Sequence, residues 1–566
     1  MPGFTFLYNL SKDFRQDNLL SIPKPPDYQQ AVYLKQASFF LFSAEYKNYP
    51  LLSWKENGYL IVFEGLIYSH DIEVLKQQVS LFCNKQNSEN GLKHWLHQLD
   101  GEFVLLVFHQ VDQQLWIWND IYGRLPVYWS RAADRFVIGR DIQQVRFLAE
   151  IDDFDPIGLA STLLFGYVPG EKSLWKQISY LPPGVLLKAH FRPFSVEISK
   201  GYQGYTFGSQ TDSNPEALLA SLSTALHNRI EKVPKLSLSL SGGLDSRLIA
   251  GLLKQMDAKL PAYTYIDAAG SAEPDLKAVE QIVAQLHWQK QHHFISLNQS
   301  EPEQFLQLME LKQGLNYAGM AFILPFLKHF SHHKMSMLTG DGGDKVLADL
   351  RPGLNIKSMD QLLKLLIQQY ARLSLKQAAA WSGTTDEALR KYFLSHLEAY
   401  DEDPGSAFSQ FLLRERGRKW LFEGEDRNRA FCWTTTPFYS QPFTQNALSI
   451  SMPDKAFGKL FLKLLKLLPG QLEQIVNPNW QLPLEEQQAI QKLYFRQQLK
   501  LKFPWLTDFQ KHLKTRKPEA MGTVFSITPD KLEKLADRGL KLKQAEIGRI
   551  DDLDLRYEIL GLAMLL

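Results

Sequence analysis

Residues 236–254, LSLSLSGGLDSRLIAGLLK, constrain this chain more than any other stretch. Leu and Ser alternate up to Leu240, a glycine-containing turn follows, and an apolar run with helical spacing continues from Arg247. This order predicts a strand, a tight turn and a helix. Glycines let the backbone approach an anion closely, and a helix N-terminus attracts negative charge. We therefore predict a pyrophosphate-binding turn, the alternative being an ordinary strand-to-helix connection.

The candidate phosphate ligands share this one turn. They are Ser241, Gly242, Gly243, Leu244, Asp245 and Ser246. Asp245 would repel a bare phosphate, so an acid at this position favours a cation between the two. A Mg²⁺ bound by Asp245 and by phosphate oxygens meets that need.

The SGGLDS turn resembles the pyrophosphate loop of the ATP-pyrophosphatase superfamily, and most closely that of the synthetase domain of asparagine synthetase. In that family ATP adenylates a carboxylate, pyrophosphate leaves, and an amine attacks the acyl-adenylate. The resemblance implies ATP and Mg²⁺ as cofactors. It also implies a doubly wound parallel sheet of the adenine nucleotide α-hydrolase type with a helical extension. Because family adenines lie against the first two strands, Leu238 and Tyr265 either face the base or belong to the core.

A second chemical centre is predicted at residues 335–345, where an apolar strand ends in a turn of glycines and acids. The turn resembles the family's SGEG-x-DE stretch, through Thr339 and Gly340 to Asp344. The resemblance makes Asp344 the second magnesium carboxylate beside Asp245. Asp341 falls where relatives have a group that acts on the nucleophile, although it is also a common turn residue.

Two further family landmarks are altered. In the stretch that resembles the family's DR-x-x-M-A and E-x-R-x-P-F motifs, Trp433 and Thr435 stand in place of the glutamate and the arginine. The family's catalytic lysine has its best counterpart in Lys517, which is otherwise one more charge on a solvated basic face. Residues 360–400 are predicted to form one long amphipathic helix, and Asn214 and Pro215 are predicted to open another that continues to about residue 231.

The first part of the chain resembles the glutaminase domain of asparagine synthetase, through an LDGEF strand at residues 99–103 and a DIYGRLPVYW stretch at residues 120–129. We expect an antiparallel, four-layer Ntn-hydrolase-like sandwich in a chain of combined α+β and α/β class. The expected domains are residues 1–190, a linker at 191–213, and the synthetase domain at 214–566.

The chemistry of a glutaminase is missing from that domain. Its nucleophile is an N-terminal cysteine, and position 2 is Pro2. The family's oxyanion-holding asparagine is replaced by Glu64, whose carboxylate we expect to repel a developing negative charge, and the family's arginine is replaced by Asn119. Asp100 matches the residue that grips the substrate amine. Cys83 lies in a predicted helix and is expected to pack rather than react.

Composition excludes several classes. The formal net charge of +2 gives no general attraction to nucleic acid, two cysteines provide no disulfide framework, and no basic segment precedes an apolar run at the N-terminus. We expect a cytoplasmic enzyme with no nucleic-acid or membrane partner, and the resemblance allows a homodimer.

The favoured function is an ATP-dependent synthetase that adenylates a small-molecule or peptide carboxylate and transfers it to an amine or to ammonia, without glutaminase activity. One alternative is a macrolactam or β-lactam-type cyclase, as in the lasso-peptide cyclases and β-lactam synthetases that resemble this architecture. Another, of a different class, is a degenerate synthetase that binds ATP and a partner without turnover.

Overall fold

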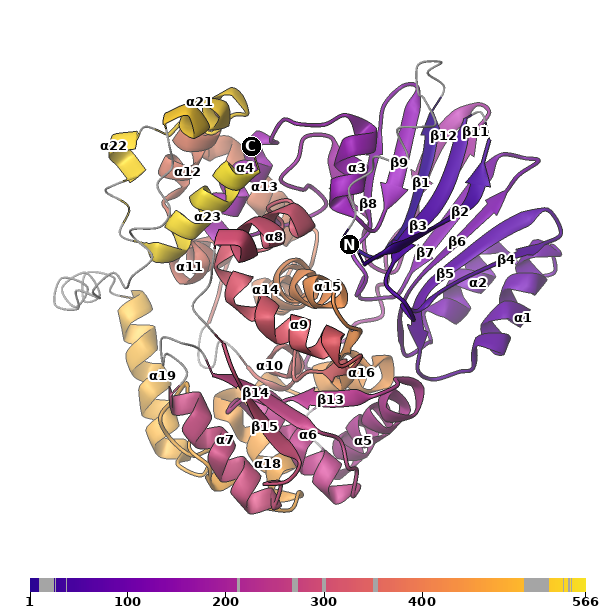
Figure 1. Ribbon diagram of the computed structural model, residues 1–566. Coiled ribbons are helices and arrows are strands. Elements are labelled where there is room, and N and C mark those ends of the chain that lie inside the picture. The colour runs from indigo at the N-terminus through magenta and orange to yellow at the C-terminus, as the bar shows by residue number, and fades with distance from the viewer. Residues whose placement is uncertain are drawn as a thin grey trace.

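The computed structural model describes two adjoining bodies, a β-sandwich built from the first third of the chain and an α/β domain built from the rest (Figure 1). The described residues are 1–9, 25, 27–36, 38–210, 214–266, 273–297, 302–349, 355–502, 529–542, 544–547, 550 and 552–565.

Two antiparallel six-stranded sheets form the sandwich, in the orders β10-β8-β9-β1-β3-β2 and β12-β11-β7-β6-β5-β4. Strands such as β1 and β6 are apolar and buried on both faces, because helices cover the outside of each sheet. The strands are β1 (Gly3–Asn9), β2 (Gln29–Lys35), β3 (Phe39–Glu45), β4 (Leu51–Glu56), β5 (Tyr59–Ile67), β6 (Gly101–His109), β7 (Gln114–Asn119), β8 (Tyr128–Arg131), β9 (Arg135–Gly139), β10 (Ile178–Tyr180), β11 (Leu186–Phe191) and β12 (Phe194–Ile198).

Side chains from both sheets interlock between them, with Phe6, Phe108 and Phe191 in mutual ring contact. Helices α1 (Ile72–Cys83) and α2 (Glu89–Leu96) pack on the outside of one sheet, and α3 (Ile142–Ala149) and α4 (Pro156–Phe165) on the side of the other. This arrangement is the predicted four-layer sandwich.

The sandwich continues into the segment predicted as a linker. Strand β12 pairs with β11 in register from Phe191↔Phe194 to Leu187↔Ile198. The chain turns at Arg192 and Pro193, which close the hairpin between β11 and β12 and lie within the sheet, not at its end. The second sheet therefore ends at Ile198.

The second domain has a five-stranded parallel sheet in the order β15-β14-β13-β16-β17. Its strands are β13 (Leu236–Ser239), β14 (Ala262–Ile266), β15 (His292–Ser296), β16 (Ser336–Leu338) and β17 (Thr434–Thr435). The chain moves outward from β13 to β15 and then returns to the other side of β13 with β16. The strand order thus reverses between β13 and β16, which is where ligands bind in open parallel sheets.

Helices surround this sheet, and those after residue 355 form the predicted helical extension. They are α5 (Pro215–Lys232), α6 (Leu244–Gln255), α7 (Glu273–Leu286), α8 (Pro302–Lys312), α9 (Leu324–His332), α10 (Gly343–Leu347), α11 (Met359–Tyr370), α12 (Leu375–Ser382), α13 (Asp386–Glu398), α14 (Pro404–Phe411), α15 (Glu423–Arg429), α16 (Gln441–Ser449), α17 (Met452–Lys455), α18 (Lys459–Lys466), α19 (Gln487–Lys502), α21 (Pro529–Asp537), α22 (Gln544–Ile547) and α23 (Leu553–Met564). The 3₁₀ segments are η2 (Ala318–Ile323), η4 (Pro437–Tyr439), η5 (Ala456–Gly458) and η6 (Leu472–Gln474), and η3 (Leu412–Phe422) is a π-helix.

Local sequence accounts for several helix ends. The side chain of Asn214 accepts the Ala217 N–H at 2.9 Å and Pro215 occupies the first turn of α5, as predicted. The long helix predicted for residues 360–400 is wrong, because Ser374 and Thr385 cap new helices and Gly383 ends α12 in the left-handed conformation.

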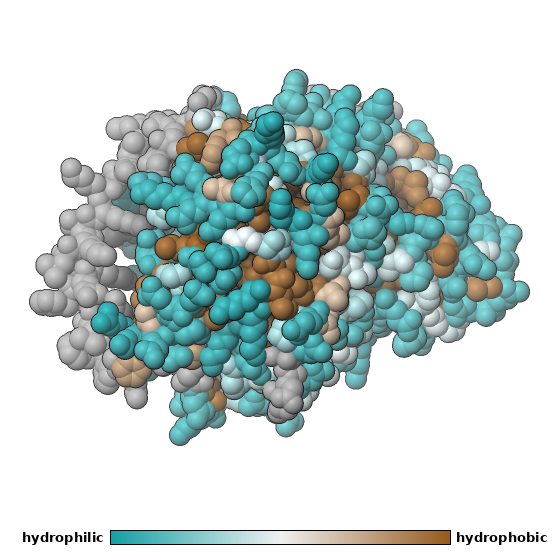
Figure 2. Space-filling view, turned by 90° about the horizontal axis from the view of Figure 1, so that it is seen from below, coloured by the Kyte–Doolittle hydropathy of each residue, from teal (hydrophilic) through white to brown (hydrophobic). Residues whose placement is uncertain are grey.

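On the face seen from below, hydrophilic residues cover most of the surface and apolar residues gather near the middle (Figure 2). Among the residues that the structure describes, no helix combines the length and apolar character needed to cross a membrane.

Candidate functional site

The predicted phosphate turn lies at the carboxyl end of β13, where it enters α6. Ser246 Oγ donates to Ser241 O at 2.9 Å and accepts the Ser241 N–H at 3.2 Å, so the two serines fix the curve of the turn. Gly243 precedes the helix and provides no side-chain cap to its N–H groups. The first turn of α6 therefore keeps its donors for an anion.

Two residues outside the turn hold it in place. Arg247 is fully buried and donates to Gly242 O at 2.7 Å and to Ile475 O at 2.8 Å, which ties the turn to the loop after η6. On the other side, the Asp275 carboxylate at the start of α7 accepts the Gly242 N–H at 2.9 Å. In this structure the Asp275 carboxylate therefore accepts a backbone N–H that a bound phosphate would otherwise accept.

The second predicted centre touches the first. A Cβ at Gly340 would lie 2.6 Å from Ser246 N, and a Cβ at Gly343 would lie 2.6 Å from Asp245 Oδ1. Only glycine permits this approach of the turn after β16 to the start of α6. Asp245 and Asp344 are consequently brought together, and Lys345 forms an ion pair with Asp344.

The paired carboxylates fit a divalent cation. Burial and the nearby Asp344 charge raise the pKa of Asp245 well above its ordinary value, which is the expected effect of two like charges sharing a desolvated site. Within the described ranges no group of three or more histidine, cysteine or acidic side chains could hold a metal. Two carboxylates completed by phosphate oxygens are a common way to bind Mg²⁺.

A pocket adjoins Asp341, three residues before Asp344, and the empty space in it, including space open to solvent, is about 590 Å³. It carries charges of both signs and two aromatic side chains, Tyr317 and Trp420, whose rings stack at 6.0 Å. Its lining residues are Gly166, Leu315, Asn316, Tyr317, Met320, Asp341, Lys419, Trp420, Leu421, Gly424, Glu425, Arg427 and Asn428. Polar groups converging in one pocket are typical of a small-molecule site.

The ionisable groups of the cavity are perturbed by their surroundings. Burial raises the pKa of Asp341, against the opposing charges of Arg427 and Arg124. Burial raises the pKa of Glu425 to about 7, although Arg124 and Arg429 are close to it. Burial also lowers the pKa of Arg427 to about 10. Two carboxyl groups with raised pKa values in one cavity are suited to proton transfer.

Apart from Asp341, the cavity residues were not among the candidate site residues predicted from the sequence, although Asn316 and Tyr317 lie where the family shapes its substrate pocket. Arg427 donates to Asn316 Oδ1 and to Asn428 Oδ1, both at 2.9 Å, so one guanidinium joins the segment before η2 to α15. Glu425 directly precedes the Asp-Arg pair of a recognised family stretch, which was its one available signal. The Glu425 Oε1 atom is buried and accepts no hydrogen bond from the described residues.

The remaining predicted site residues fall in different places. Thr339 is buried, and its Oγ1 accepts the Asp341 N–H at 3.4 Å. Leu238 is fully buried in the core, whereas Tyr265 is partly exposed and packs against Phe322 and Phe326. Leu238 thus corresponds to the core alternative. Lys517 lies outside the described residues.

The residues predicted to correspond to the glutaminase centre interact with one another and with their neighbours. The Glu64 carboxylate is fully buried, lies 2.9 Å from Arg140 Nε, and accepts hydrogen bonds from Tyr49 Oη at 2.6 Å and from Phe4 N at 3.2 Å. Glu64 is thus paired with the buried Arg140, a partner that the sequence did not reveal.

The other expected glutaminase residues also have structural partners. Asp100 forms a buried ion pair with Arg229 of α5 at 3.0 Å. Asn119 accepts the Val185 N–H at 3.0 Å and donates to Pro182 O at 2.8 Å. Cys83 is buried, and burial raises its pKa to about 12, so its thiol packs as predicted.

Glu64→Asn should destabilise the fold. It removes one partner of the buried Arg140 charge, and breaking a buried ion pair costs about 3–5 kcal/mol. Denaturant unfolding should show this decrease in the free energy of unfolding, while Glu197→Gln on the exposed face of β12 should change it by less than about 0.5 kcal/mol. Equal stabilities of the Glu64 variant and the wild type would contradict the ion-pair account.

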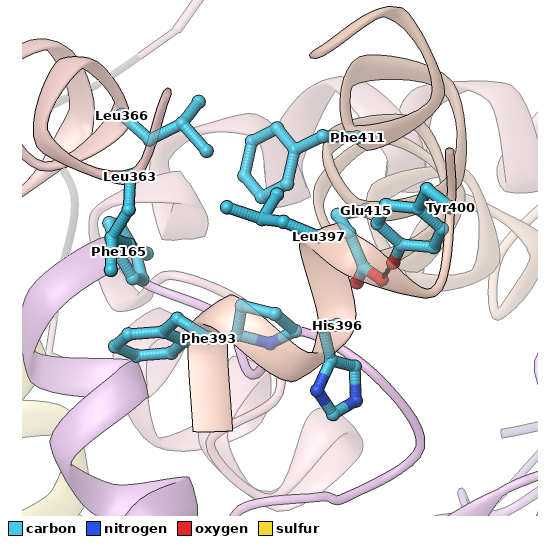
Figure 3. Close-up of a pocket in the computed structure, with 10 residues that line it drawn as sticks. Phe165, Leu363, Leu366, Phe393, His396, Leu397, Tyr400, Phe411 and Glu415 are labelled. Atoms are coloured by element: carbon cyan, nitrogen blue, oxygen red, sulfur yellow. Dashed lines mark hydrogen bonds between the residues drawn. The ribbon is translucent and has the colours of Figure 1, made fainter. Parts of the chain in front are cut away.

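A second cavity lies away from these centres, between α4 and the helices of the extension (Figure 3). Its empty volume is about 320 Å³, and Phe165, Leu363, Phe393 and Phe411 form most of its wall. Its one buried carboxylate, Glu415, accepts the Gly170 N–H at 3.0 Å and bonds to Tyr400. We assign it to packing between the sandwich and the extension.

Comparison with known proteins separates the same two parts. A family model described as asparagine synthase matches residues 217–465, and one described as a glutamine amidotransferase domain matches residues 44–200. No curated protein matches the chain.

Two solved structures share limited similarity. NMN synthetase from Francisella tularensis is 17% identical with a TM-score of 0.20, over 36% of this chain and 95% of its own. The glutamine phosphoribosylpyrophosphate amidotransferase from B. subtilis is 12% identical with a TM-score of 0.22, over 55% of this chain and 86% of its own.

An Ntn-like antiparallel sandwich joined to a parallel-sheet nucleotide domain defines the class of two-domain, amidotransferase-type synthetases. The chain belongs to the asparagine synthetase family. Its general function is therefore ATP-dependent amide formation.

Proposed function

We propose that this protein adenylates a carboxylate with ATP, releases pyrophosphate, and transfers the acyl group to an amine that glutamine does not supply. The observation that carries the proposal is the meeting of Asp245 and Asp344 beside a phosphate-binding turn, with the Asp341 cavity next to them. The substrates are a small-molecule or peptide carboxylate and an amine or ammonia.

The first step joins a carboxylate oxygen of the substrate to the α-phosphorus of ATP and breaks the α–β bond. The turn from Ser241 to Ser246 and the N-terminus of α6 would hold the departing pyrophosphate. A Mg²⁺ held by Asp245 and Asp344 would neutralise its charge. On binding, a phosphate oxygen would replace Asp275 as the acceptor of the Gly242 N–H.

In the second step the amine attacks the acyl carbon, the bond to the AMP oxygen breaks, and the amine loses one proton. Asp341 and Glu425 line the cavity and are placed to accept that proton. Arg427 is a fixed positive charge in the same cavity and is suited to a substrate carboxylate.

Carboxylate-dependent exchange between ATP and labelled pyrophosphate tests this proposal, using amino acids and short peptides as candidate carboxylates. Exchange above the carboxylate-free background is the expected result. Tight ATP binding with no exchange and no ATP cleavage for any carboxylate would favour the degenerate synthetase instead.

Glutamine should not be hydrolysed by this protein. Pro2 provides no nucleophile, and in Pro2→Cys the Glu64 carboxylate would still lie at the start of β1 where it accepts the Phe4 N–H. We expect no release of glutamate above buffer background from either the wild type or the Pro2→Cys variant. Steady glutamate release from either one would overturn the assignment of an inactive glutaminase.

A further inference from the structure

Helix α15 lies between the substrate cavity and the sandwich domain and has side chains that contact each of them. The helix has only seven residues, Glu423–Arg429, yet its five charged side chains are all at most 4% exposed. Glu425 and Arg427 line the cavity. Charged side chains this deeply buried require partners, so the neighbours of α15 decide where its charges lie.

The sandwich domain provides the partner of Glu425. Arg124 Nη2 lies 2.6 Å and Arg124 Nε 3.1 Å from Glu425 Oε2, and all of these side chains are fully buried. The Arg124 guanidinium also lies 5.0 Å from the ring of Phe422 and 5.2 Å from that of Tyr439. These rings fix the plane of the guanidinium, and a planar fork gives the carboxylate a definite orientation.

The sandwich domain also holds the next residue of α15. Asp426 forms ion pairs with Arg140 and, at 2.7 Å, with Lys312, and these two cations lower its pKa to about 2. Arg140 is the same residue that neutralises Glu64. One buried arginine, Arg140, therefore links Glu64 to Asp426 of α15, the helix that lines the synthetase cavity.

These contacts place one oxygen of Glu425 against Arg124 and leave Oε1 without a hydrogen-bond partner in the described structure. The charged or titratable groups near Glu425 are Arg124 from the turn after β7, Glu102 from β6, Arg429 from α15, and Asp341 after β16. Tyr439 of η4 also lies close to this cluster. Arg124 is thus the cation that binds Glu425 at the shortest distance.

We propose that the sandwich domain has become the support of the synthetase cavity, with Arg124 acting as a positioning residue that orients Glu425 and controls its protonation. A role for Glu425 in catalysis rests on the proposed function, whereas the contact between Arg124 and Glu425 does not. An inactive domain of this kind remains necessary for the reaction because it holds the charges of α15.

The protonation of Glu425 provides a test that needs no substrate. Removing Arg124 takes away the nearest positive charge, and an opposite charge at this distance lowers a carboxyl pKa by about 1–3 units. Arg124→Met should therefore keep Glu425 protonated to a pH at least about one unit higher than in the wild type. Infrared difference spectra recorded against pH would follow the protonated carboxyl band, and Glu425→Gln identifies which band belongs to Glu425.

Arg229→Met is the matched control, because it breaks the buried interdomain pair with Asp100 and makes no contact with Glu425. It should leave the titration of the Glu425 band unchanged. Arg124→Lys should give a smaller upward shift than Arg124→Met, because lysine retains the charge but not the pair of hydrogen bonds that Nε and Nη2 donate to Oε2. If Arg124→Met fails to fold, Arg124→Gln, which keeps an N–H donor toward Glu425, serves in its place.

An unchanged Glu425 titration in the Arg124 variants, or an equal shift in Arg229→Met, would overturn the positioning role. A shift specific to Arg124, in a protein that shows no pyrophosphate exchange with any carboxylate, would support the positioning role and contradict the proposed function. The two claims therefore fail separately.

Discussion

Asp245→Asn and Asp344→Asn should each abolish carboxylate-dependent ATP–pyrophosphate exchange. Cleavage of the α–β bond builds charge on the leaving pyrophosphate, and a fixed Mg²⁺ stabilises that charge by several kcal/mol. Since about 1.4 kcal/mol corresponds to a factor of ten, the loss should be roughly a thousandfold. Exchange rates measured at saturating ATP and Mg²⁺ would give this comparison.

Asp257→Asn is a suitable control for these variants. Asp257 is exposed just beyond the other end of α6 and has a φ of 51°, a conformation that asparagine also tolerates. Its exchange rate should equal that of the wild type. Unchanged exchange in both Asp245→Asn and Asp344→Asn would show that these carboxylates do not hold the metal of an adenylation site.

Asp341→Asn and Glu425→Gln should retain exchange but lose amide product. Both residues line the cavity beside the phosphate site, and proton transfer by a positioned side chain typically contributes about a hundred- to ten-thousandfold in rate. The product rate should fall by that factor while adenylation continues. Parallel assays of exchange and of amide formation on each variant would separate the two steps.

The wild-type pH dependence follows from the same groups. Burial raises the pKa of Glu425 to about 7, and a group that accepts a proton must first be deprotonated. Amide formation should therefore increase as the pH rises through about 7, and Glu425→Gln should lose that increase. A variant that loses exchange and product equally would instead assign Asp341 or Glu425 to adenylation.

The phosphate turn and the second centre could be predicted because their residues are consecutive. Alternating Leu and Ser, two glycines and a helical run determine the path from β13 into α6 locally. The register Leu238↔Leu338 then places the ends of β13 and β16 side by side, so the two turns meet. The convergence of Asp245 and Asp344 was predicted from the family resemblance of the two turns, and the reversal of strand order between β13 and β16 explains it.

The cavity was harder to predict because its residues come from distant segments. Asn316 and Arg427 are hydrogen-bonded partners separated by 111 positions, and no local periodicity connects them. Glu425 belongs to a short, fully buried helix in which most residues are charged. Such a pattern resembles a solvated surface until its ionic partners are known.

The environment of Glu64 could not be predicted for the same reason. Its partner Arg140 is 76 positions away and is shared with Asp426 of the other domain. The family resemblance predicts that the glutaminase chemistry is missing, but it did not reveal the ion pair between Glu64 and Arg140. The segment predicted as a linker shows a related difficulty, since Arg192 and Pro193 turn the chain within a sheet rather than between domains.

The products of ATP cleavage test the central claim most directly. Phosphorus NMR of a reaction with ATP, Mg²⁺, a carboxylate that supports exchange and an amine should show AMP and pyrophosphate in equal amounts. Formation of ADP and phosphate would contradict adenylation, because it would mean that the β–γ bond had been broken instead.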